Sequence, residues 1–191
     1  MIVQQGIPED QIDVAVELYW QAFGAKLGKV MRPEVKAKRF IKRVMDADHA
    51  LSAIDGQGQL LGVAGFKTHK GALVGGGMFD LWQVYGIGSL WRAVLISFLE
   101  RDVENERFLM DGIFVSPSAR GQGVGTALLR ALYDLGKTRG YKEIRLDVID
   151  SNPRAKALYE REGFVAKDVH KLGLLEPIFS FKSATTMVRE L

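Results

Sequence analysis

The chain of 191 residues contains no cysteine. A disulfide framework, a thiolate metal site and a cysteine nucleophile are therefore excluded. No apolar run is long enough to cross a bilayer, since the densest stretch, from Trp91 to Leu99, already contains Arg92 and ends at Glu100. The three histidines stand far apart in the sequence and do not have the spacing of metal ligands. These absences predict a cytoplasmic protein without a bound metal.

The sequence also has little net charge. Its 26 basic and 23 acidic residues leave +3 at pH 7, which does not by itself indicate a nucleic-acid partner but permits a local site for an anionic ligand. Residues 1–11 show neither the basic nor the apolar part of a secretory signal. The composition is 47% apolar and 26% charged, as in ordinary globular domains. We therefore expect one domain over residues 1–191, with no nucleic-acid and no membrane partner.

The hydrophobic periodicity predicts a mixed α/β fold. Helical spacing of apolar residues indicates a first helix that ends at Gly24 and Gly28 and a second that starts at Pro33. Further helices are expected at residues 121–138 and 153–162. Strands are expected at residues 2–5, 50–54, 60–67, 108–115, 143–149, 164–169 and 183–189. Because a strand, a helix and a strand follow one another from 108 to 149, at least one strand pair should be parallel.

Residues 68–107 form an insertion that is too apolar for a solvated linker. Four glycines precede a segment with large apolar residues at helical spacing. Trp82, Trp91, Leu95 and Phe98 are expected to bury a homodimer contact or to roof a ligand pocket. The third alternative is that they belong to an ordinary core.

The most informative motif is a glycine-rich turn between a strand and a helix. It reads Arg120-Gly121-Gln122-Gly123-Val124-Gly125-Thr126. The first turn of a helix has unpaired N–H groups and a partial positive charge, and glycines let an anion approach them. A phosphate or pyrophosphate site is therefore favoured over a merely tight turn. The P-loop pattern is excluded because Thr126 is not preceded by Lys, and the dinucleotide pattern because position 126 is not Gly or Ala.

A second motif follows, and together the two resemble a known family. It reads Asn152-Pro153-Arg154-Ala155-Lys156-Ala157-Leu158-Tyr159-Glu160-Arg161-Glu162-Gly163-Phe164. Asn152 and Pro153 are typical of a helix start. Both motifs and their spacing are similar to those of the GCN5-related N-acetyltransferases, over residues 107–165. The resemblance implies a mixed, mostly antiparallel sheet of six to seven strands flanked by helices. The insertion at residues 68–107 would lie between the third and fourth strands, where the commonest family pattern has a short loop.

The resemblance also implies which residues bind acetyl-CoA, the acetyl donor. The turn from Arg120 to Thr126 would hold the pyrophosphate. The main chain of Ile113, Phe114 and Val115 would pair with pantetheine, whose arm would also contact the side of the helix that carries Asn152 and Ala155. Tyr159 would lie near the cofactor sulfur and protonate the departing thiolate. The alternative for Tyr159 is a core aromatic residue, because phenols are also common in packing.

Asp111 is the candidate for the general base. Period-two alternation places it on the strand face of Leu109, Ile113 and Val115, where burial would raise its pKa towards neutral pH. Gly112 next to it suggests a bulge. The alternative is a structural carboxylate bonded to backbone N–H groups.

The sequence thus predicts an N-acetyltransferase that uses acetyl-CoA. A primary amine of a small molecule or a protein would attack the thioester directly, with Asp111 or a water held by it as base and Tyr159 as acid. Two alternatives stay open: a non-catalytic module that binds or senses acyl-CoA, and an acyltransferase that uses longer acyl chains.

Overall fold

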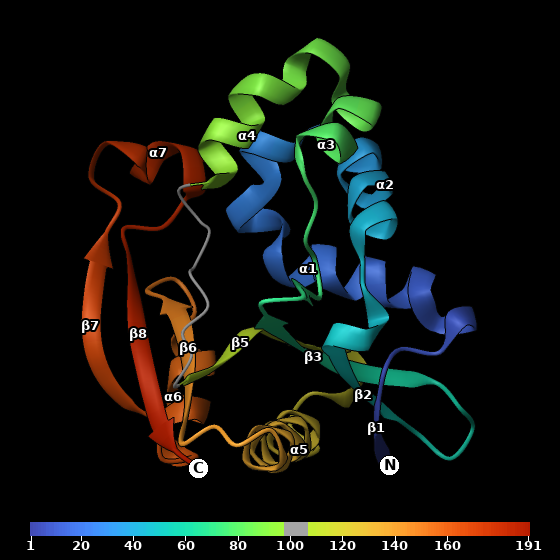
Figure 1. The fold of residues 1–191 in the computed structure, drawn as a ribbon, viewed down its shortest axis with the longest axis vertical. Coiled ribbons are helices and arrows are strands. Elements are labelled where there is room, and N and C mark those ends of the chain that lie inside the picture. The colour runs from blue at the N-terminus through green and yellow to red at the C-terminus, as the bar shows by residue number, and fades with distance from the viewer. Residues whose placement is uncertain (98–106) are drawn as a thin grey trace.

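The computed structural model describes residues 1–97 and 107–191, and they build one twisted sheet of eight strands between two layers of helices (Figure 1). The strand order is β1-β2-β3-β5-β6-β8-β7, and β4 pairs with β3. Only the pairing of β5 with β6 is parallel among the described strands. The strands are β1 Ile2–Gln5, β2 Ala50–Ile54, β3 Leu60–Thr68, β4 Gly71–Ala72, β5 Arg107–Val115, β6 Glu143–Ile149, β7 Val165–Lys171 and β8 Ser183–Glu190.

Helices cover both faces of the sheet. Figure 1 shows α1 to α4 on one face and α5 and α6 on the other, with α7 beside the ends of β7 and β8. Their bounds are α1 Ile12–Met31, α2 Glu34–Val44, α3 Met78–Tyr85, α4 Ser89–Ser97, α5 Val124–Thr138, α6 Pro153–Arg161 and α7 Glu176–Phe179. None of the helices in the described ranges is long and apolar enough to cross a membrane.

The alternation of the sequence explains the central layer. In β6 every second residue is buried, and Ile144, Leu146 and Val148 point into a core shared with α5. The helix α5 contributes Leu128 and Leu132 to that core, and both are fully buried. These patterns made the strand–helix–strand unit from β5 to β6 predictable, and the predicted parallel pair is confirmed.

The prediction that Gly24 and Gly28 end the first helix is wrong. α1 continues through both glycines to Met31. Its last turn buries Val30 and Met31 in a second core between α1, α2 and α3, and the hydroxyl of Tyr85 donates a hydrogen bond to the Met31 carbonyl at 2.6 Å. Burial of apolar side chains outweighs the cost of about 1 kcal/mol for each glycine in a helix.

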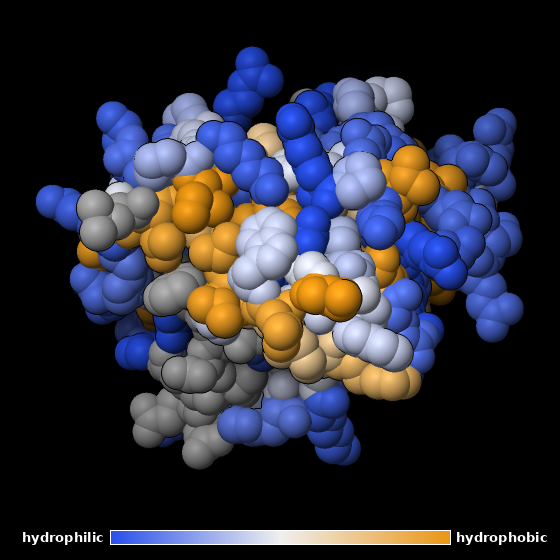
Figure 2. All heavy atoms as spheres, turned by 90° about the horizontal axis from the view of Figure 1, so that it is seen from above, coloured by the Kyte–Doolittle hydropathy of each residue, from blue (hydrophilic) through white to orange (hydrophobic). Residues whose placement is uncertain are grey.

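The insertion between β3 and β5 is largely helical, as expected, but it holds β4 and two helices, α3 and α4, in the described part. Leu81 and Leu95 pack inward against the second core. Large apolar side chains also face outward, including Phe79 at 63%, Trp82 at 58% and Trp91 at 46% exposure. Figure 2 looks onto this end of the molecule and shows hydrophobic residues lying between charged ones. Phe98 lies outside the described residues.

Candidate active site

The glycine-rich turn links β5 to α5. Gly121 and Gly123 have positive φ angles of 77° and 81°, a conformation that side chains with a Cβ rarely adopt. The helix therefore begins at Val124, with Gly123 as its N-cap, rather than at Gly121 as the sequence suggested. A Cβ on either glycine would meet no heavy atom within 4 Å. Backbone conformation, not crowding, thus requires glycine here, and the space beside the turn is open to a ligand.

Several N–H groups of this turn have no backbone hydrogen-bond acceptor in the described part of the chain. Within the described part of the chain, no backbone carbonyl accepts from the N–H of Gly121, Gly123, Val124, Gly125 or Thr126. Arg120 adds a guanidinium beside them, held by a hydrogen bond of 3.3 Å from its Nε to the Val115 carbonyl. Gln122 instead folds back, and its Nε2 donates to the Ser118 carbonyl at 2.8 Å. The exposed donors and the cation fit a pyrophosphate group.

The second motif packs against the first. A Cβ on Gly125 would lie 3.3 Å from Cδ2 of Leu158, so glycine at this position lets α6 approach α5 closely. The Asn152 side chain caps α6 by accepting a hydrogen bond from the N–H of Ala155 at 3.2 Å. This capping role is the one that the sequence indicates. The contact of Asn152 and Ala155 with pantetheine remains a prediction.

Beyond its first three residues, β5 separates from β6. The parallel pairing joins Arg107 to Glu143 and ends at Leu109 with Arg145. The rest of β5 pairs with β3 alone, so among the described residues the edge of Ile113, Phe114 and Val115 that faces β6 has no strand partner. This open edge leads directly to the glycine-rich turn. It offers peptide groups without a strand partner to an extended ligand, as expected for the pantetheine arm, although the Val115 carbonyl accepts the hydrogen bond from Arg120.

The bulge predicted at Gly112 is present, and its extra residue is Asp111. Gly65 pairs with Gly112 and Phe66 with Met110, so Asp111 has no partner on β3. The extra residue shifts the alternation. Ile113 and Val115 face the α5 side of the sheet. The side chain of Asp111 lies on the opposite face of the sheet, where it lines a cavity beside α1. The prediction that Asp111 shares a face with Ile113 and Val115 is therefore wrong.

The cavity that holds Asp111 has a volume of about 480 Å³ and lies between the sheet and α1 to α4. Asp111 is exposed to the space of the cavity, and partial desolvation by the protein atoms around it raises the pKa of its carboxyl group. The charges of Lys67 and Lys26 act in the opposite direction, and so does a hydrogen bond from the N–H of Val74. The carboxylate thus accepts a hydrogen bond from the backbone, as the structural alternative expected. It also lines a cavity, as a catalytic base would need to do.

Two aromatic residues of α1 complete this end of the cavity. The ring of Tyr19 packs against Phe23 with centroids 4.7 Å apart and meets the edge of Phe114 at 5.6 Å. A Cβ on Gly112 would come within 2.7 Å of Phe23, so the glycine of the bulge makes room for this ring. Burial, and secondarily the nearby Asp111, raises the pKa of Tyr19. The sequence showed Tyr19 and Phe23 only as apolar positions of a helix, and nothing in it marked Lys26 or Lys67.

Tyr159 lies on the other side of the sheet. Its side chain is 5% exposed in the core with α5, and its ring meets Phe164 at 5.8 Å. Burial raises the pKa of its hydroxyl, with a smaller contribution from Tyr133, so the phenol keeps its proton at neutral pH. The two residues predicted for proton transfer therefore face opposite sides of the sheet. Their catalytic roles remain predictions.

The fold is the one found in solved N-acetyltransferases. An N-acetyltransferase from Staphylococcus aureus Mu50 superposes with a TM-score of 0.68 at 15% identity, covering 99% of this chain and 100% of that one. A GCN5-related N-acetyltransferase from Kribbella flavida gives 0.64 at 18% identity, over 100% and 97% of the two chains. The family model described as the acetyltransferase (GNAT) family matches residues 13–164, so the chain belongs to the GNAT family.

Similarity to curated proteins is more local. A mycothiol acetyltransferase from Beutenbergia cavernae is 43% identical over 56 residues, which is 29% of this chain and 19% of that protein. The same enzyme from Salinispora tropica is 33% identical over 126 residues, 65% of this chain and 31% of the relative. A thialysine N-epsilon-acetyltransferase from Bos taurus is 35% identical over 54 residues, 28% and 32% of the two chains. The chain thus spans less than a third of the length of each of these three relatives.

Proposed function

We propose that the protein transfers the acetyl group of acetyl-CoA to a primary amine of a small molecule or a protein. The observation that carries the proposal is the open edge of β5, which runs from the bulge at Asp111 to the glycine-rich turn. Main-chain groups without a strand partner and a carboxylate with a raised pKa thus lie on one strand, and the glycine-rich turn follows that strand. Membership of the GNAT family and relatives named as acetyltransferases of mycothiol and thialysine support it.

The residues present fit the cofactor. The open N–H groups of Gly121 to Thr126 and the guanidinium of Arg120 would hold its pyrophosphate, and the free edge of Ile113 to Val115 would hold its pantetheine arm. A solved structure from Bacillus anthracis, assigned as a streptothricin acetyltransferase, contains acetyl coenzyme A and superposes with a TM-score of 0.51 at 17% identity, over 74% of this chain and 61% of that one. When bound, the cofactor supplies an activated thioester.

Side chains of the protein then accept and donate the protons of the reaction. The Asp111 carboxylate, directly or through a water, takes a proton from the amine as nitrogen bonds to the carbonyl carbon. Peptide N–H groups of the free β5 edge would polarise the carbonyl oxygen. As the carbon–sulfur bond breaks, the Tyr159 hydroxyl gives its proton to the sulfur. The raised pKa of Asp111 suits a base that works near neutral pH. The raised pKa of Tyr159 keeps its hydroxyl protonated before the transfer and also makes it a weaker acid.

Amine-dependent release of CoA separates this proposal from a module that only binds acyl-CoA. In the experiment, purified protein is incubated with acetyl-CoA and a panel of primary amines, and free CoA is titrated with a thiol reagent. Release that depends on both the amine and the Asp111 carboxyl group supports the transferase. Comparison of acetyl-CoA with longer acyl-CoA donors then tests the acyl length.

Three finer assignments belong to the same proposal. We place a homodimer contact on α3 and α4, because Phe79, Trp82 and Trp91 expose large apolar surfaces there and monomers rarely leave such patches uncovered. The proposal that the insertion also roofs the acceptor pocket is supported by Leu81 of α3 and Ile96 of α4, which line the cavity. The cytoplasmic location stays a prediction of the sequence, which cell fractionation would test.

A further inference from the structure

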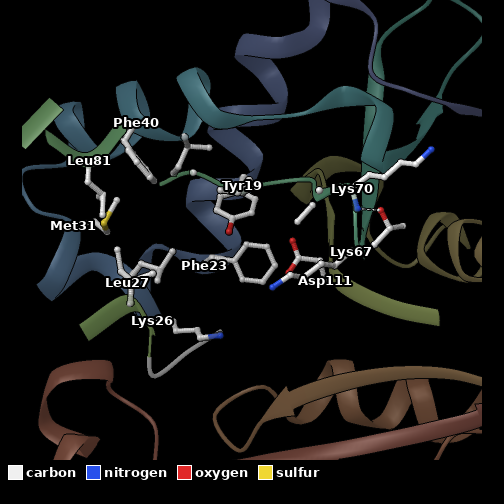
Figure 3. A pocket seen from close by; sticks show the side chains of 18 of the residues that line it. Tyr19, Phe23, Lys26, Leu27, Met31, Phe40, Lys67, Lys70, Leu81 and Asp111 are labelled. Carbon is white, nitrogen blue, oxygen red and sulfur yellow. Dashed lines mark hydrogen bonds between the residues drawn. The ribbon is translucent and has the colours of Figure 1, made fainter. Parts of the chain in front are cut away.

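The cavity beside Asp111 has two chemically different ends. Figure 3 shows Asp111 and Lys67 at one end, Tyr19 and Phe23 in the middle, and apolar side chains at the other end. That apolar end is lined by Leu27, Met31, Phe40, Leu81 and Ile96. Lys70 also lines the cavity, but in Figure 3 its amine points away from the apolar end.

The apolar end reaches into the second core of the protein. Met31, Phe40 and Leu81 are each less than 8% exposed and belong to the cluster between α1, α2 and α3. The cavity as a whole has a volume of about 480 Å³, which lies within the range of small-molecule sites, and the apolar end is one part of that space. The space therefore suits a ligand group that favours apolar surroundings.

A charged group would bind poorly in this end of the cavity. The lining named above offers carbon and sulfur atoms but no carboxylate, so a second ammonium group placed there would lose its hydration without gaining a counter-ion. Transfer of a methylene chain or an aromatic ring from water into the same space is favourable. The opposite end of the same cavity suits the amine group of an acceptor, because Asp111 and the hydroxyl of Tyr19 lie there.

We propose that the acceptor is a primary amine with an apolar chain or ring, bound with its nitrogen at Asp111 and its apolar part between α1, α2 and α3. The assignment rests on the proposed acetyl transfer and adds the acceptor class to it. Polyamines and short polar amines are poor acceptors by the same argument. Leu27 determines this specificity from the C-terminal part of α1, where it is half-buried at the cavity wall.

The test is a series of acceptors that differ only in their apolar part. Propylamine, butylamine, pentylamine and hexylamine are compared with phenethylamine, ethanolamine and spermine at saturating acetyl-CoA. Each added methylene should raise kcat/KM about four-fold, the effect of burying one methylene group, until the cavity is full. Binding of the same amines is measured in parallel by calorimetry, which does not depend on turnover.

Two matched variants locate the effect. Leu27→Gln places an amide in the apolar end and should lower the ratio of hexylamine to propylamine turnover about tenfold. Leu135→Gln makes the same change at a half-buried leucine of α5 outside the cavity lining and should leave both the ratio and the activity unchanged.

The outcomes separate this inference from the proposed function. Acetylation that favours ethanolamine or spermine, or that is insensitive to chain length, overturns the acceptor class and leaves acetyl transfer intact. Binding that strengthens with chain length while no amine is acetylated supports the cavity assignment and overturns the proposed transfer. A chain-length dependence that survives Leu27→Gln places the apolar part elsewhere and also overturns the inference.

Discussion

Gly123 gives the sharpest test of the cofactor site, because its backbone and its surroundings can be perturbed separately. Gly123→Asn and Gly123→Asp introduce side chains of the same size at a position with φ of 81° and open space around the Cβ. The left-handed conformation costs a residue with a Cβ about 1–2 kcal/mol. In a protein of this length that cost lowers Tm by about 2–8 °C, to a similar extent in both variants.

Charge then distinguishes the two variants. A carboxylate about 4 Å from a phosphate repels it by about 4 kcal/mol at an effective dielectric constant of 20, which weakens binding about 10³-fold. Acetyl-CoA at 100 times the wild-type Kd stabilises the wild type by about 2.7 kcal/mol, a Tm increase of about 5–11 °C. Gly123→Asp should lose this increase, whereas Gly123→Asn should keep part of it.

The assay is thermal unfolding followed by circular dichroism with and without acetyl-CoA. Without cofactor, Gly123→Asp should unfold no earlier than Gly123→Asn, since a negative charge at the N-cap favours α5. A full Tm increase with acetyl-CoA in Gly123→Asp would refute the placement of the pyrophosphate at this turn.

Four further predictions concern the acid, the base and the outer face of the insertion. Tyr159→Phe keeps the ring packed against Phe164 but removes the hydroxyl, so kcat should fall about 10²-fold or more while acetyl-CoA still raises Tm; unchanged kcat would make Tyr159 a core residue only. Because burial raises the pKa of Asp111, wild-type kcat/KM should increase with pH through that raised pKa, and Asp111→Asn should lose this acidic limb; a limb that persists would exclude Asp111 as the base. A carboxyl group with a raised pKa binds its proton more tightly in the folded state, so its contribution to stability is lost as pH rises, and Asp111→Asn should resist urea better than wild type at pH 8. Light scattering should give twice the chain mass for wild type and the single mass for Trp82→Lys; a monomeric wild type would refute the dimer contact.

Local patterns were enough to predict much of this fold. The strand from Glu143 to Ile149 was predicted with its observed bounds, because one residue in two is apolar there. The cap of α6 by Asn152 followed from the Asn-Pro pair. The glycine-rich turn was recognised because its conformation and its open N–H groups depend on residues adjacent in sequence. These features require no knowledge of distant contacts.

Features that depend on tertiary contacts were not predictable in the same way. α1 passes through Gly24 and Gly28 because residues 81–96 of the insertion bury its last turn, which local propensity does not show. The direction of Asp111 depends on where the extra residue of the bulge falls relative to β3. The cavity wall combines α1, α3 and the turn after β3, so Tyr19 and Lys67 had no common signal in the sequence.

The central claim is acetyl transfer to an amine, and its most direct measurement counts both products. Wild-type protein, acetyl-CoA and phenethylamine are incubated together, free CoA is titrated, and the acetylated amine is quantified by mass spectrometry. The account predicts one N-acetylated amine for each CoA released, and a lower rate of formation of both products with Asp111→Asn at neutral pH. Saturable binding of acetyl-CoA with no amine-dependent product across the amine panel would contradict it and would identify a binding module instead.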